Sequence, residues 1–134
     1  MNMKKTIVAV DDSNIVLKML EEILSDDYDF HGFSKGMRAL QYLKNTRPDL
    51  IILDVDMPEI DGYEMLRLIR ERYTLKSKSV PVIFLTSNND KEHVVKAVEA
   101  GANDYAVKPV SEDILMTKIE NLLEGNKEIS WDNI

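Results

Sequence analysis

The chain has 134 residues, 44% hydrophobic and 31% charged, a balance typical of one globular domain with a core large enough to fold alone. Its 24 acidic and 17 basic residues give a formal net charge of -7, which argues against nonspecific binding to nucleic acid or to an anionic membrane surface. There is no cysteine, no apolar stretch of the roughly 20 residues that a membrane helix needs, and no signal peptide pattern, so we expect a cytoplasmic protein without disulfides.

The first part of the chain alternates two predicted strands with two predicted helices. Thr6–Val10 is a nearly continuous apolar run, as in a parallel strand covered on both faces, and Ile15–Leu24 has apolar residues at helical spacing. Phe30–Phe33 is a weaker strand pattern that fits the edge of a sheet. A second helix is predicted from Met37 and ends before Pro48.

Two strongly apolar strands follow, at Leu50–Leu53 and Val80–Leu85. The segment between them has apolar residues at positions 65, 66, 68 and 69, which predicts a third helix that Asp61-Gly62 opens.

The last part of the domain predicts a helix over Asp90–Ala100, a strand over Tyr105–Val107 and a helix from Ser111 to Gly125. Strand and helix therefore alternate five times, which predicts a doubly wound α/β domain with a five-stranded parallel sheet and five helices. We assign residues 1–124 to this domain. Residues 125–134 lack periodicity and are predicted to be a C-terminal tail or the start of a linker.

Polar side chains follow four of the predicted strands. They are Asp11-Asp12, Asp54 with Asp56, Thr86-Ser87 and Lys108-Pro109. Parallel pairing brings these strand ends to one edge of the sheet, where ligands bind in open α/β sheets. Several carboxylates gathered there would repel one another, and a hard divalent cation such as Mg²⁺ relieves that repulsion through oxygen ligands.

This set of groups is typical of phosphoryl transfer to a carboxylate. The carboxylate attacks phosphorus, the cation neutralises charge on the equatorial oxygens, and Lys108 and Thr86 hold the product. An acyl phosphate hydrolyses readily, which suits a timed switch.

Each group taken alone also has a purely structural interpretation. The alternatives are a helix cap for Asp11-Asp12, a turn residue for Asp56, a cap of the fourth helix for Thr86 and a strand end for Lys108-Pro109. The prediction of a site depends on their joint placement at successive strand ends.

Four motifs carry a resemblance to a known family. They are VDDS (Val10–Ser13), LDVDMPEIDGYE (Leu53–Glu64), LTS (Leu85–Ser87) and GANDYAVKP (Gly101–Pro109). Through them, residues 4–124 resemble the receiver domain of two-component response regulators, which has a flavodoxin-like, chemotaxis-regulator-like fold. The resemblance implies a phosphoprotein of signal transduction. It would catalyse only its own Mg²⁺-dependent phosphorylation and dephosphorylation and would not be an enzyme with a separate substrate.

The resemblance also implies a role for each acidic residue of the motifs. Asp54 would be the phosphoacceptor. Asp11 and Asp12 would bind Mg²⁺ (or Mn²⁺) together with Asp54 and the backbone carbonyl of Asp56.

Further roles follow from the resemblance for residues of the last two motifs. Thr86 and Lys108 would contact the phosphoryl group, and Tyr105 would be the aromatic switch residue whose ring turns inward when Thr86 moves. Asp56 and Asn88 occupy positions at which the family tunes the dephosphorylation rate. The Lys108-Pro109 peptide bond is one that the family usually holds cis.

The expected partners are proteins. A histidine kinase or a histidine phosphotransfer protein would supply the phosphoryl group in a phosphorelay, and the surface of the fourth helix, fifth strand and fifth helix would contact an unknown downstream protein or an output domain. No output domain follows residue 124, so the chain either acts alone or belongs to a longer regulator. The sequence does not decide whether the chain forms a homodimer through that surface. Family members that do so pair acids on the fifth strand with basic residues on the helices; Asp104 fits the strand position, but the fifth helix offers only Lys118. We expect no direct binding to nucleic acid or membrane.

Two other classes of function compete with this interpretation. A haloacid-dehalogenase-type phosphatase would use Asp54 and Asp56 as nucleophile and acid, but Met57-Pro58 stands where that family usually has Gly-Thr, and Asp11-Asp12 has no role there. An FMN-binding module would need a phosphate-binding first loop, and the acidic first loop of this chain repels phosphate. A P-loop motif is absent from the sequence.

Overall fold

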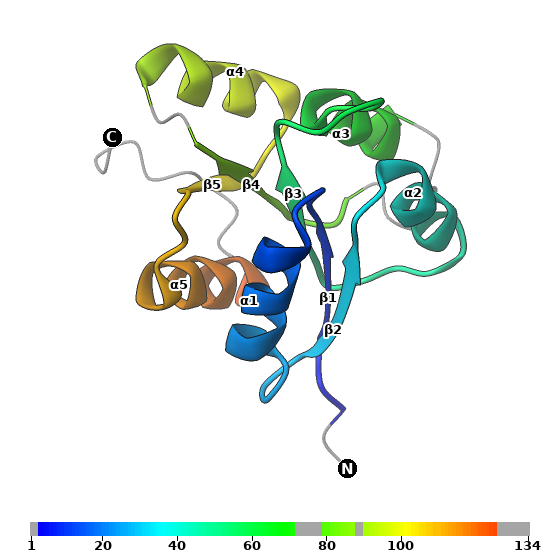
Figure 1. The fold of residues 1–134 in the computed structure, drawn as a ribbon, viewed down its shortest axis with the longest axis vertical. Coiled ribbons are helices and arrows are strands. Elements are labelled where there is room, and N and C mark those ends of the chain that lie inside the picture. Colours follow the sequence, from blue (N-terminus) through cyan, green and yellow to red (C-terminus); the bar gives the residue numbers. More distant parts are fainter. Residues whose placement is uncertain (1–2, 72–78, 88–89, 126–134) are drawn as a thin grey trace.

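A computed structural model of the chain describes residues 3–71, 79–87 and 90–125. Five parallel strands form one sheet, as predicted, in the order β2-β1-β3-β4-β5 (Figure 1). The strands are β1 (Thr6–Val10), β2 (Asp29–Phe33), β3 (Leu50–Asp54), β4 (Val82–Thr86) and β5 (Asp104–Val107). The weakest predicted strand, β2, lies at an edge, and the strand order reverses between β1 and β3, where doubly wound sheets bind ligands.

Five helices cover the two faces of the sheet. They are α1 (Asn14–Leu24), α2 (Gly36–Asn45), α3 (Gly62–Glu71), α4 (Lys91–Ala100) and α5 (Glu112–Leu123). Helices α1 and α5 pack on one face, and α2, α3 and α4 pack on the other (Figure 1). This arrangement confirms the predicted doubly wound α/β architecture.

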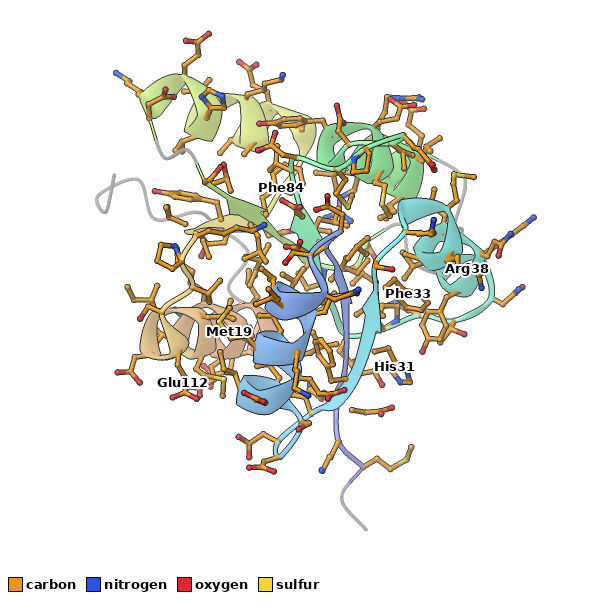
Figure 2. The ribbon with its side chains drawn as sticks, viewed as in Figure 1. Met19, His31, Phe33, Arg38, Phe84 and Glu112 are labelled. Atoms are coloured by element: carbon orange, nitrogen blue, oxygen red, sulfur yellow. The ribbon has the colours of Figure 1, made fainter. Side chains whose placement is uncertain are left out.

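Alternate side chains of each strand supply the two halves of the core. In β1, Val8 and Val10 point into the layer of α2, α3 and α4, whereas Ile7 and Ala9 point into the layer of α1 and α5. Phe84 of β4 lies in the first of these layers (Figure 2). Burial on both faces explains why the central strands are almost continuously apolar.

Most predicted helix ends are confirmed by capping contacts. The side chains of Ser13, Asp90 and Ser111 accept hydrogen bonds from backbone N–H groups at the starts of α1, α4 and α5. Gly101 ends α4 with φ 99°, a left-handed conformation that glycine adopts without strain.

The predicted start of the fourth strand was two residues too early. Strand β4 begins at Val82 and not at Val80, because Pro81 has no N–H to donate to the ladder and the carbonyl of Val80 accepts a hydrogen bond from Arg70. Helix α2 ends at Asn45, before Pro48, as predicted.

Two other predictions fall outside the described residues: the rate-tuning role of Asn88 and the tail character of residues 126–134. Within the described part of the chain, the structure contains no helix whose length and hydropathy would let it cross a lipid bilayer.

Candidate functional site

Three aspartates meet at the carboxyl edge of the sheet. Val10 of β1 pairs with Leu53 of β3, so the residues that follow them, Asp11 and Asp54, stand side by side. Asp11 is 0% exposed and Asp54 is 2% exposed. Asp12 is exposed at the rim, and one carboxylate oxygen from each of the three aspartates lies within 4.8 Å of the others. We call Asp11, Asp12 and Asp54 the acidic trio.

Lys108, the residue directly after β5, brings an ammonium group to the acidic trio. Its backbone N–H donates to the carbonyl of Thr86 (2.8 Å), which extends the pairing of β4 with β5 to the edge of the sheet. Its ammonium Nζ lies 2.9 Å from Oδ2 of Asp11 and 3.3 Å from Oδ1 of Asp54. The Lys108-Pro109 peptide is cis, as the resemblance implies.

The electrostatics of the site are dominated by its buried acids. Burial, and then the charge of Asp11, raise the pKa of Asp54 to about 7, although Lys108 opposes the shift. Burial lowers the pKa of Lys108, but the carboxylates of Asp11 and Asp54 outweigh burial and raise it overall. Three carboxylates therefore face one ammonium, and the site has an excess of negative charge at neutral pH.

The oxygen-rich donor set of the acidic trio fits a hard divalent cation. Carboxylate oxygens are the ligands that Mg²⁺ and Mn²⁺ prefer, whereas zinc favours the nitrogen and sulfur ligands that this group lacks. A cation there would also offset the excess negative charge. The residues present thus fit the predicted metal.

Thr86 and Tyr105 meet at one small cavity beside the acidic trio. Thr86 is the last residue of β4 and is 7% exposed, and Tyr105 in β5 is 9% exposed. Both line the cavity under α4, together with Phe84, Val94 and Ala97. The two residues of the switch hypothesis are therefore both largely buried and line the same cavity.

One acid on β5 has its partner within the same chain. Nζ of Lys118 lies 2.8 Å from Oδ1 of Asp104 and 5.0 Å from the ring centroid of Tyr105. The two residues considered for a homodimer contact thus pair inside one molecule.

Asp56 stands apart from the acidic trio. Its side chain is exposed and is not among the grouped carboxylates, while its backbone N–H donates to Oδ1 of Asp54 (3.2 Å). The backbone of Asp56 thus helps to orient Asp54, and its predicted metal and rate-tuning roles stay predictions.

Gly62 belongs to the site although the sequence interpretation gave it only a role in opening a helix. A Cβ at this position would lie 2.6 Å from the carbonyl oxygen of Asp54 and 2.9 Å from Cα of Val55. Its N–H donates to the carbonyl of Val55 (3.0 Å). Helix α3 therefore approaches the backbone of the central aspartate at a distance that only glycine permits.

Comparisons with known proteins agree with this geometry. The sequence profile of the response regulator receiver domain matches residues 7–120. The transcriptional regulatory protein AfsQ1 of Streptomyces coelicolor is 41% identical over 100 residues, which cover 75% of this chain and 42% of AfsQ1. The chain spans about half the length of the curated relatives it matches.

Solved structures show the same fold. The chemotaxis protein CheY4 of Vibrio cholerae has a TM-score of 0.82 at 28% identity, and the match covers 89% of this chain and 98% of CheY4. The receiver domain of the sensor histidine kinase PA1611 of Pseudomonas aeruginosa, with a magnesium ion coordinated in its active site cleft, has a TM-score of 0.82 at 27% identity, covering 92% of this chain and 100% of that domain.

The family match leaves the phosphatase alternative without support, because the profile extends from β1 into α5 and includes the strand ends that carry the acidic trio, Thr86 and Lys108. The chain belongs to the family of response regulator receiver domains, the phosphorylatable regulatory domains of two-component signal transduction.

Proposed function

We propose that this receiver domain accepts a phosphoryl group on Asp54, with Asp11, Asp12 and the backbone carbonyl of Asp56 as further ligands of Mg²⁺ or Mn²⁺. The observation that carries the proposal is the burial of Asp54 against Asp11, with the ammonium of Lys108 within 3.3 Å of both carboxylates. Asp54 lies at the end of the central strand β3, and burial raises its pKa to about 7.

The protein groups have separate tasks in this reaction. The ionised carboxylate of Asp54 attacks phosphorus, and the bond from phosphorus to the donor atom breaks. Lys108 is placed to move from the carboxylates to the new phosphoryl oxygens, and Thr86 offers a hydroxyl donor at the end of the neighbouring strand. When bound, the divalent cation neutralises charge on the phosphoryl oxygens. The same residues would support self-dephosphorylation by water.

The switch is proposed to act through Thr86 and Tyr105. A phosphoryl group on Asp54 attracts the Thr86 hydroxyl and favours the inward ring of Tyr105, and the exposed surface of α4, β5 and α5 changes with it. This is a shift between two existing populations, biased by local hydrogen bonds and charge. The shared cavity of Thr86 and Tyr105 supports the coupling.

The proposed phosphodonor, domain limits and output are those that the family implies. The chain acts in the cytoplasm, where a histidine kinase or a phosphotransfer protein supplies the phosphoryl group, and residues 1–124 form the receiver with residues 125–134 as tail or linker. The output is either a separate downstream protein or a further domain. AfsQ1 is named a transcriptional regulatory protein, which makes gene regulation one candidate output.

Incubation with acetyl phosphate and Mg²⁺ is expected to add one phosphoryl group to the chain, measured as intact mass. The adduct should be absent in Asp54→Asn, because the amide is a poor nucleophile, and absent with EDTA. Asp56→Asn is the matched control, an exposed acid two residues away, and should still be phosphorylated. An adduct on Asp54→Asn of equal yield would refute the assignment.

Mg²⁺ is expected to bind more tightly as the pH rises, since Asp54 must lose its proton to become a ligand and its pKa is raised to about 7. Between pH 6 and pH 8 we expect about a tenfold gain in affinity, measured by isothermal titration calorimetry. Asp54→Asn should remove most of that dependence. Equal affinities at both pH values in the unsubstituted protein would contradict the placement of Asp54 in the metal site.

A further inference from the structure

A hollow of about 290 Å³ opens beside the acidic trio. Its walls come from the loops that follow β1, β2 and β3, and they include Asp12, Lys35, Met57 and Glu59. Asp12 belongs both to the acidic trio and to this wall. The hollow is therefore continuous with the site where phosphoryl transfer is proposed.

Lys35 is the one cation among the residues that line this hollow. Its backbone takes the N-cap position of α2, and its side chain makes no capping hydrogen bond. The side chain is exposed, and within residues 3–71, 79–87 and 90–125 its ammonium has no recorded hydrogen bond or ion pair. Lys108, in contrast, is held by Asp11 and Asp54. Lys35 can thus meet an incoming anion without first breaking an ion pair.

The size of the hollow and the ammonium of Lys35, which faces the carboxylates of Asp12 and Glu59 across the same lining, define which ligand could enter. Its volume is near the lower end of the range for small-molecule sites, roughly 300 Å³, which suits a compact ligand. The chain has a net charge of -7 and therefore repels dianions at long range. The ammonium of Lys35 would reduce this electrostatic repulsion locally.

We propose that Lys35 is a specificity-determining residue that draws dianionic acyl phosphates to the acidic trio. The inference rests on the proposed phosphoacceptor role of Asp54. In the reaction, the bond between phosphorus and the acyl oxygen breaks, a bond forms between phosphorus and a carboxylate oxygen of Asp54, and the donor leaves as a carboxylate with the electron pair. No proton, oxidant or further reactant is needed. Lys35 positions the donor and does not contact the transferred phosphorus.

The test compares two small phosphodonors of different charge on the full chain with Mg²⁺. Acetyl phosphate is mainly a dianion at neutral pH, whereas phosphoramidate carries less negative charge. For Lys35→Gln we expect the second-order rate constant with acetyl phosphate to fall about 3- to 10-fold at low salt, through weaker donor binding, and to change less than twofold with phosphoramidate. Lys35→Arg should keep the rate, and about 1 M salt should abolish the difference.

Arg38→Gln is the matched control, because Arg38 lies in the first turn of the helix that Lys35 precedes, and its side chain projects outward from α2 (Figure 2). It removes the same charge away from the hollow and should leave both rates within twofold. Three results would each overturn the role of Lys35 and leave the proposed function intact. They are an equal loss of rate with the two donors in Lys35→Gln, an unchanged rate in Lys35→Gln, and an equal loss of rate in Arg38→Gln. If neither donor modifies the unsubstituted chain at Asp54, the proposed function fails and this inference fails with it.

Discussion

Replacing Gly62 with alanine is expected to lower the free energy of unfolding by about 2–4 kcal/mol. The new Cβ would lie 2.6 Å from the carbonyl oxygen of Asp54 and 2.9 Å from Cα of Val55, and both atoms belong to the backbone of a buried strand end. Relief requires α3 to move away from β3. Urea denaturation of the two proteins measures the loss, and a displaced Asp54 should also slow phosphorylation by acetyl phosphate.

Gly36→Ala provides a matched control for this prediction. Gly36 also begins a helix and is also buried, and its Cβ would meet Cγ2 of Ile60 at 2.7 Å and Sδ of Met65 at 2.9 Å. Those atoms belong to side chains, which can shift more readily than the backbone of a buried strand end, so we expect a smaller loss of about 1–2 kcal/mol. Equal losses in both variants would show that the close approach to Asp54 has no special structural role.

Without divalent cations, the titration of Asp54 is expected to make the protein lose stability as the pH rises from about 4 to 7. In the folded state, burial and then Asp11 hold the pKa of Asp54 at about 7, whereas an unfolded aspartate releases its proton near pH 4. The folded state therefore binds more protons in this window, and unfolding releases them, so stability falls with rising pH. The contribution of Asp54 to the free energy of unfolding is fully present below about pH 4 and is lost as the pH passes through about 7.

Asp54→Asn should remove most of this pH dependence, because the amide has no charge to place beside Asp11. At pH 8 with EDTA, the variant is expected to be about 1–2 kcal/mol more stable than the unsubstituted protein, measured by urea denaturation. With saturating Mg²⁺ the unsubstituted protein should become the more stable of the two, since Mg²⁺ binds its folded state more tightly than that of Asp54→Asn. Parallel stability curves for the two proteins across this pH range would contradict the raised pKa of Asp54.

The fold was predictable because its signals are local. The apolar runs of Thr6–Val10 and Leu50–Leu53 belong to strands buried on both faces, and Ser111 and Gly101 cap helices with their own neighbours in the sequence. The meeting of Asp11 with Asp54 was predictable for a different reason, since parallel strands bring their carboxyl ends to one edge.

Contacts between elements were less predictable. Nothing local to Gly62 indicates that α3 packs so near the Asp54 backbone that a Cβ would not fit, and nothing in the fifth helix indicates that Lys118 pairs with Asp104 of its own chain. Lys35 has no motif around it, and its place beside Asp12 follows only from how three loops meet. Such contacts depend on the packing distance between elements, which periodicity and capping do not determine.

The most direct test of the central claim locates the phosphoryl group on a residue. After reaction with acetyl phosphate and Mg²⁺, borohydride reduces an aspartyl phosphate to homoserine, and peptide mass spectrometry identifies the changed position. Phosphorylation as proposed predicts homoserine at position 54 and nowhere else in the chain. Homoserine at position 11, 12 or 56, with aspartate intact at 54, would contradict it.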